Sequence, residues 1–71
     1  ILDGDLAIIK QENTAENGQI VVAVLDDAIT LKRFFQEACR VRLEPENAAY
    51  KPIYCQNVQV VGILAGIIRT Y

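Results

Sequence analysis

The sequence predicts an all-β fold built from short antiparallel strands. Its apolar residues fall in short runs rich in Ile and Val, and Gly, Pro, Asn and Asp separate these runs. Almost no stretch repeats apolar residues at the spacing of an amphipathic helix. With 71 residues, of which 52% are hydrophobic and 23% charged, the chain has the composition of one small globular domain. At this size a single core supplies little net stability, so we expect further sequence or a partner to bury additional apolar surface.

The first two predicted strands are separated by a polar segment and an Asn-Gly turn. Leu6–Lys10 is the first apolar run. Asn17 and Gly18 both tolerate positive φ and therefore predict a turn. The segment 19–25 follows and is apolar without interruption from Ile20 onward. We expect this second strand to be central in the sheet and covered on both faces, because a half-exposed strand would alternate.

A β-hairpin is the next predicted element. Asp26 and Asp27 form a tight connection between the second strand and a third strand over 28–35. That third strand carries Lys32.

The segment 36–38 turns the chain into a strand over 39–44. Here Val41 and Leu43 alternate with Arg40 and Arg42, as on an amphipathic edge strand. Because Glu44 and Glu46 follow these arginines, the polar face is interpreted as a solvated surface and not as a nucleic-acid contact.

Two prolines mark the last loop before the final strand. Pro45 and Pro52 bracket this loop because proline lacks the amide donor that a sheet ladder needs. We expect Tyr50 to pin the loop to the core. The segment 58–70 returns to strand, with Gly62 and Gly66 as bulges or as places where another backbone comes close.

Composition excludes several kinds of functional site. The chain contains no His and no Ser, so neither a Ser-His-Asp triad nor a Cys-His nucleophile pair can form within it. Cys39 and Cys55 cannot complete a zinc site without His, and we expect both to be reduced and buried. Asp3-Gly4-Asp5 lacks the ligand spacing of a calcium loop and is interpreted as a turn. We expect no metal and no cofactor.

Charge and hydropathy limit the partners. The net charge of −2 argues against a nucleic-acid-binding surface, which needs clustered Lys and Arg. The longest apolar stretch, 60–68, is less than half of the ~20 residues that a membrane-spanning helix needs. The sequence therefore predicts a soluble module that does not itself read DNA.

Lys32 is the candidate catalytic residue. In a strand, Thr30, Lys32 and Phe34 share one face, whereas Leu31, Arg33 and Phe35 share the other, so either Lys32 or Arg33 points inward. Burial disfavours the charged form of a lysine, and a neutral lysine can act as a general base. The alternative is a snorkelling lysine with its stem on the sheet and its head in water.

Five blocks of the sequence resemble the peptidase domain of LexA-like SOS repressors, in the order and approximate spacing of that family. They are ILDGDL at 1–6, NGQIVVA at 17–23, TLKRF at 30–34, LEPEN at 43–47 and VGILAGIIR at 61–69. The resemblance implies a LexA/signal-peptidase-like sheet domain, of which residues 1–71 would be the C-terminal part.

The resemblance also implies a serine-lysine autopeptidase. Lys32 matches the lysine that deprotonates the serine in this family. The family's serine lies in an S-M motif a short step before the I-x-D-G-D block, which here would place it ahead of Ile1. The scissile Ala-Gly segment and the DNA-binding helix-turn-helix are expected further upstream. The 71-residue chain alone is therefore expected to be inactive.

A LexA-like parent would be a cytoplasmic dimer that binds operator DNA through its N-terminal domain and represses DNA-damage genes. A RecA filament on single-stranded DNA would stimulate its self-cleavage. The segment 58–69, which starts at Val58 and ends at Arg69, resembles the family's dimer-forming strand. It is equally interpretable as an ordinary core strand.

Four alternatives share this resemblance. A UmuD-like accessory subunit of a mutagenic polymerase has the serine-lysine chemistry but no DNA-binding domain, and the blocks at 43–47 and 66–69 look more like the repressor. A phage repressor would differ in its operator. A signal-peptidase-like enzyme would need a membrane anchor. A non-catalytic dimerisation module would have lost its serine.

Overall fold

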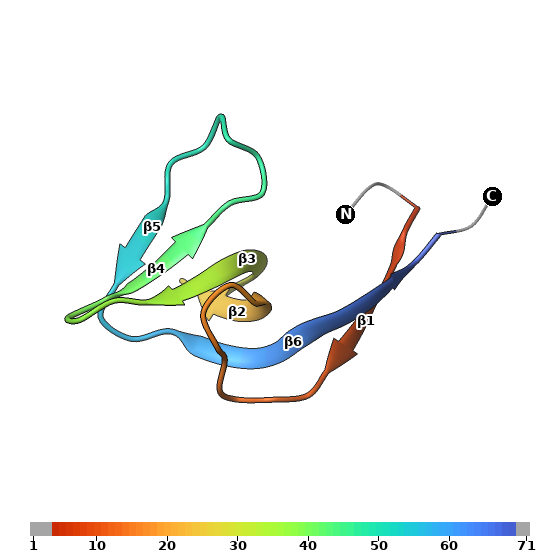
Figure 1. Ribbon diagram of the computed structural model, residues 1–71, viewed down its shortest axis with the longest axis horizontal. Helices are drawn as coiled ribbons and strands as arrows, with labels where there is room; N and C mark the ends of the chain where they lie inside the picture. The colour runs from red at the N-terminus through yellow and green to blue at the C-terminus, as the bar shows by residue number, and fades with distance from the viewer. Residues whose placement is uncertain (1–3, 70–71) are drawn as a thin grey trace.

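Six strands form one antiparallel sheet in the computed structural model, which describes residues 4–69. None of the described residues is helical, and the predicted all-β fold is confirmed. The strands lie side by side in the order β1-β6-β2-β3-β4-β5 (Figure 1). Their bounds are β1 Leu6–Lys10, β2 Ile20–Leu25, β3 Ala28–Gln36, β4 Val41–Glu44, β5 Ile53–Cys55 and β6 Gln59–Ile68.

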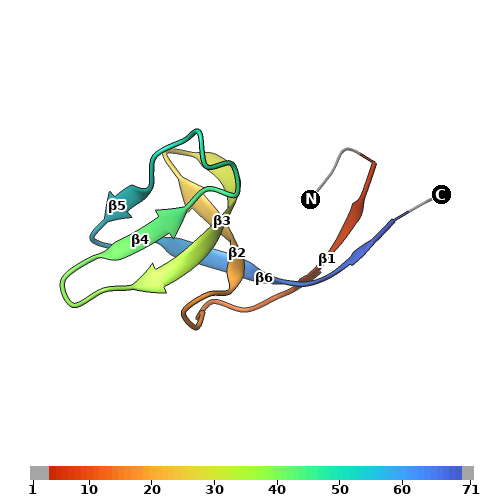
Figure 2. The same ribbon diagram turned by 45° about the horizontal axis from the view of Figure 1, so that its top comes forward.

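The sheet curls around a small apolar core and extends into an arm. Strands β2 to β5 and the first half of β6 surround the core, whereas β1 and the second half of β6 project away together as a two-stranded ribbon (Figures 1 and 2). The molecule measures 43 × 28 × 23 Å as a result. The buried core side chains come from four strands: Val21, Ala23, Phe34, Val41, Leu43 and Val60.

The β2–β3 hairpin forms as predicted. Its two turn residues, Asp26 and Asp27, have φ values of 50° and 64°, which is the conformation that a two-residue hairpin with primed geometry requires. Strand β2 lies between β6 and β3, so its predicted central position is also confirmed. The predicted cover on both faces is wrong. Val21 and Ala23 are fully buried, but Val22 and Val24 on the opposite face are half-buried, because no second layer covers that face within residues 4–69.

Strand β4 is not the edge strand that the sequence predicts. The three residues of β5 pair with it, and Leu43 lies opposite Ile53. Strand β4 also begins at Val41, later than predicted, because the Glu37 amide donates to the Arg40 carbonyl and closes the preceding turn. Tyr50 is 68% exposed and does not pin the loop to the core.

The loop between β4 and β5 is held by its own hydrogen bonds. The Tyr50 amide donates to the Asn47 carbonyl at 3.1 Å, and the Ala49 amide donates to Asn47 Oδ1 at 2.9 Å. An asparagine side chain that accepts from a nearby backbone amide stabilises a local turn without any contact to the core.

Strand β6 bends past its neighbours with the help of two bulges. Its register with β2 skips Val61, and its register with β1 skips Ala65. A Cβ atom on Gly62 would overlap Ile9 Cγ2 and lie 3.2 Å from the Lys10 carbonyl oxygen. The skipped residues thus lie next to the two glycines that the sequence singled out, and the predicted close backbone approach is found at Gly62 but not at Gly66.

The two cysteines are free thiols, and the prediction that both are buried is wrong, because neither is fully buried. Cys39 is exposed because it lies in the turn between β3 and β4, whereas Cys55 in β5 is half-buried. Over residues 4–69, no helix is long and apolar enough to cross a membrane.

Candidate active site

Lys32 lies on the core side of the sheet. In the β2–β3 register Lys32 is opposite Val21, which is fully buried, and residues directly opposite each other project from the same face. Phe34, two residues further along β3, is 7% exposed and belongs to the core. Of the two neighbouring cations, Lys32 is thus the inward one, and its side chain is half-buried.

Arg33 points to the opposite face and connects two loops. Its Nη1 donates to the Gly18 carbonyl oxygen at 2.6 Å, and its Nη2 lies 3.1 Å from Glu46 Oε1. Arg33 thus has a structural role, because it links the loop at Gly18 to the loop at Glu46.

Neutral oxygens hold the Lys32 amine. Lys32 Nζ donates to Thr30 Oγ1 at 2.7 Å and to the Leu31 carbonyl at 3.2 Å. Within the described part of the chain, no carboxylate forms an ion pair with it. A hydroxyl and a carbonyl of β3 therefore orient the Lys32 amine on the core side of the sheet.

A row of four side chains crosses the core face of the sheet through Lys32. The strand registers place Lys32, Val21, Ile63 and Lys10 opposite one another on β3, β2, β6 and β1. The two cations at its ends are separated by two apolar residues, so the sheet keeps Lys32 apart from Lys10.

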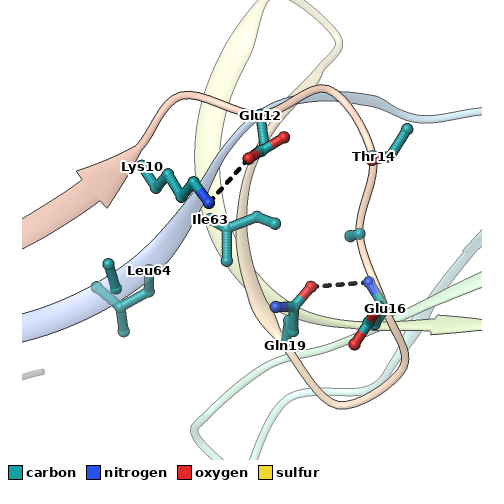
Figure 3. Close-up of a pocket in the computed structure, with 9 residues that line it drawn as sticks. Lys10, Glu12, Thr14, Glu16, Gln19, Ile63 and Leu64 are labelled. Carbon is teal, nitrogen blue, oxygen red and sulfur yellow. Dashed lines mark hydrogen bonds and ion pairs between the residues drawn. The ribbon is translucent and has the colours of Figure 1, made fainter.

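An open hollow of about 410 Å³ lies beside the Lys10 end of this row (Figure 3). Lys10 Nζ forms an ion pair with Glu12 Oε1 at 3.2 Å, and Gln19 Oε1 accepts from the Glu16 amide at 2.8 Å. These two contacts pair some of the polar groups that line the hollow. Lys32 is not among its lining residues, so the hollow and the candidate base are separate features.

The outer face of β3 and β4 carries an ion-pair network, as the solvated-face interpretation of Arg40 and Arg42 predicts. Arg42 pairs with Glu44 and, at 3.2 Å, with Glu37, which also accepts from Arg40 Nε at 2.7 Å. The hydrogen bond from Arg40, with help from Arg42, lowers the pKa of Glu37 below its ordinary value despite some desolvation. The hydrogen bond to Glu44 is the main cause that raises the pKa of Arg42.

Sequence reasoning missed two parts of this network. Glu37 was not singled out, although it follows β3 directly and lies three residues before Arg40. Each arginine also stacks on an aromatic ring: Arg40 lies 3.8 Å above the Tyr54 ring centroid and Arg42 lies 4.4 Å above that of Phe35. The Tyr54 contact could not be foreseen without β5.

The described residues offer no metal site. No group of three or more His, Cys, Asp or Glu side chains in residues 4–69 could hold a metal ion. Gly4 has a φ of 87°, as suits a turn before β1, whereas Asp3 lies outside the described residues.

Comparisons with known proteins identify relatives across the whole chain. Residues 1–67 match the model of the family described as Peptidase S24-like. The chain is 56% identical over 71 residues to a LexA repressor of Clostridium botulinum (strain Langeland), and 58% identical over 73 aligned residues to that of Clostridium novyi. A LexA repressor of Clostridium perfringens is 54% identical over 71 residues. The chain spans about a third of these relatives, 35% of the botulinum protein and 36% of the novyi protein.

Proposed function

Because the chain belongs to the Peptidase S24-like family, we propose that it is the lysine-bearing part of a serine-lysine autopeptidase domain in a LexA-like repressor. One observation carries the catalytic part of this proposal. Lys32 lies on the core face of β3 beside the fully buried Val21, and Thr30 and Leu31 hold its amine through neutral oxygens. The matching LexA repressors support the repressor part.

In the proposed reaction Lys32 is the general base. Its neutral amine takes the proton from a serine hydroxyl, and the serine oxygen attacks the carbonyl carbon of an Ala-Gly bond in the protein's own chain. The proton then passes to the leaving amine, and water hydrolyses the acyl-enzyme. The family resemblance places the serine and the cleaved bond ahead of Ile1, and the 71 residues themselves contain no serine. Residues 1–71 alone would be inactive.

The proposed parent is a cytoplasmic regulator of the SOS response. It binds operator DNA through an N-terminal domain ahead of this chain and cleaves itself when a RecA filament stimulates it. The net charge of −2 is compatible with this division, because the peptidase part does not need to bind DNA.

The proposed parent is also a homodimer that forms through residues 58–69, from Val58 to Arg69. Beyond Ile63, strand β6 pairs with β1 on one side, and within residues 4–69 no strand pairs with its other side. Ile67 and Ile68 in this part are exposed. An unpaired strand with apolar side chains is suited to pair with a second copy across a two-fold axis.

A comparison of lysine variants tests the catalytic proposal. The full-length protein is incubated at mildly alkaline pH without RecA, and cleavage is followed by gel electrophoresis. We expect cleavage to accelerate as pH rises, because Lys32 must be neutral to accept a proton. Lys32→Ala should lower the rate about a hundredfold or more, as expected for loss of a general base.

Lys51→Ala is the matched control, because Lys51 is an exposed lysine in the loop before β5. It should cleave at the wild-type rate. Equal cleavage in wild type and Lys32→Ala would refute the assignment of Lys32. Absence of cleavage in every protein, with or without RecA filaments, would favour a non-catalytic dimerisation module.

A further inference from the structure

Asn17 is chemically different from the other asparagines of the chain. Of the four, at positions 13, 17, 47 and 57, it is the only one followed by glycine. An asparagine side chain can be attacked by the backbone nitrogen of the next residue. A glycine in that place offers no side chain to hinder the attack, and asparagine is accordingly a thermolabile residue. Asn17 is exposed, so water can reach it.

The folded sheet restrains both reacting groups. The Gly18 nitrogen, which would be the nucleophile, donates its proton to the Phe34 carbonyl at 2.8 Å. Asn17 Oδ1, on the carboxamide that would be attacked, accepts from the Gln36 amide at 2.7 Å. Arg33 Nη1 fixes the other side of the turn through the Gly18 carbonyl oxygen at 2.6 Å. Three residues of β3 thus hold the Asn17-Gly18 turn.

We propose that Asn17 is a deamidation site, and that these contacts from β3 slow its deamidation in the folded protein. The reaction needs the Gly18 nitrogen to lose its proton, and it needs the Asn17 side chain to turn toward that nitrogen. The hydrogen bonds to Phe34 and from Gln36 oppose both movements. The modification therefore proceeds through local opening of the turn, whose free energy sets the degree of protection.

The chemistry requires only water. The Gly18 nitrogen forms a bond to Asn17 Cγ, its proton goes to solvent, and the Cγ–Nδ2 bond breaks as ammonia leaves. Water then opens the succinimide at one of its two carbonyls and gives aspartate or isoaspartate. Isoaspartate lengthens the backbone by one methylene and shifts Gly18 relative to β3. We expect this shift to weaken the contacts of Gly18 with Phe34 and Arg33.

The experiment compares folded and unfolded protein. The full-length protein is incubated at mildly alkaline pH with and without urea, then digested with trypsin and analysed by mass spectrometry. The peptide 11–32 contains both Asn13 and Asn17, so Asn13 serves as an internal control. We expect Asn17 to deamidate at least about tenfold more slowly in the folded protein, and faster than Asn13 in urea. An isoaspartyl methyltransferase with a radioactive methyl donor identifies the isoaspartate product.

Two arginine variants test the restraint itself. Arg33→Ala removes a contact of the turn but leaves the Asn-Gly sequence intact, and it should deamidate several-fold faster than wild type under native conditions. Arg40→Ala removes another surface arginine, one paired with Glu37, and should deamidate at the wild-type rate. Circular dichroism checks that both variants are folded. Equal Asn17 rates with and without urea would overturn the proposal, as would equal rates in Arg33→Ala and wild type.

Discussion

At the scale of single residues, Glu37 links the two arginines that stack on the outer face. It accepts from Arg40 at 2.7 Å and from Arg42 at 3.2 Å, while the arginines cover the rings of Tyr54 and Phe35. A carboxylate shared by two guanidinium groups holds both in place, and the network joins the β3–β4 turn to β4 and β5.

The lowered pKa of Glu37 predicts an acid-dependent loss of stability. In the unfolded chain its pKa returns to about 4.3. Because the folded pKa lies below this value, the stabilisation is fully present above the unfolded pKa and is lost as pH falls through the folded pKa. The free energy of unfolding of wild type should therefore decrease more between pH 7 and pH 3 than that of Glu37→Gln.

Urea denaturation at the two pH values measures this difference. Arg40→Ala removes the largest cause of the lowered pKa and should reduce the effect of Glu37→Gln. The same pH dependence in wild type and Glu37→Gln would contradict the prediction.

Lys32 and Arg33 show what the sequence could and could not decide at this scale. Strand alternation places them on opposite faces, but it does not say which face is buried. The answer depends on the pairing of Lys32 with Val21, a contact between strands. The sequence also does not determine the hydrogen bond from Lys32 to Thr30, because this bond depends on the side-chain conformation of both residues. The catalytic role of Lys32 came from family resemblance and stays a prediction.

At the scale of elements, the sequence predicted those strands and turns that depend on residues adjacent in the chain. The β2–β3 hairpin depends on adjacent residues that accept positive φ, and Asp26 and Asp27 adopt it. Strand β5 escaped prediction because three residues after a proline are too few for any periodicity. That omission also caused the wrong assignment of β4 as an edge, since the status of a strand depends on its neighbours.

The packing of β1 against β6 predicts that alanine substitutions at the two glycines of β6 change the free energy of unfolding by different amounts. Gly62→Ala should lower the free energy of unfolding by about 1–3 kcal/mol, because its Cβ would overlap Ile9 and approach the Lys10 backbone. Gly66→Ala is the control. Its Cβ would lie 3.7 Å from Ile8 Cδ1, an ordinary contact, so the change should be neutral or slightly stabilising.

Denaturant unfolding of both variants decides between these outcomes. Combining Gly62→Ala with Ile9→Ala should recover part of the loss, because the second substitution removes the overlapping methyl group. Equal effects of the two glycine substitutions would show that the backbone at Gly62 relaxes freely.

At the scale of the whole molecule, the β1–β6 arm is the part with least cover. Leu6, Ile8, Ile9, Ile67 and Ile68 are all exposed large apolar residues on it. A two-stranded ribbon by itself has marginal stability in water. The arm therefore fits the proposed dimer, in which a second copy adds strands and buries apolar surface.

The dimer proposal predicts that Ile67→Glu weakens self-association of the full-length protein about tenfold or more, because a charge replaces an apolar contact at the pairing edge. Sedimentation velocity over a concentration series measures the dissociation constant. Ile29→Glu is the control: Ile29 is 75% exposed but lies next to the β2–β3 turn, away from the arm. An unchanged dissociation constant for Ile67→Glu would exclude this edge.

The start of β1 and the end of β6 lie next to each other at the end of the arm. Leu6 lies opposite Ile68 in the ladder, and Arg69 Nε lies 3.4 Å from Asp5 Oδ2. Any polypeptide joined ahead of Asp5 and any joined after Arg69 would thus leave the sheet side by side, at the end of the arm that is farthest from the core. The adjacent ends of β1 and β6 in an isolated sheet are suited to a direct connection. A short linker between them, with new termini in the exposed loop between β4 and β5, should preserve the sheet.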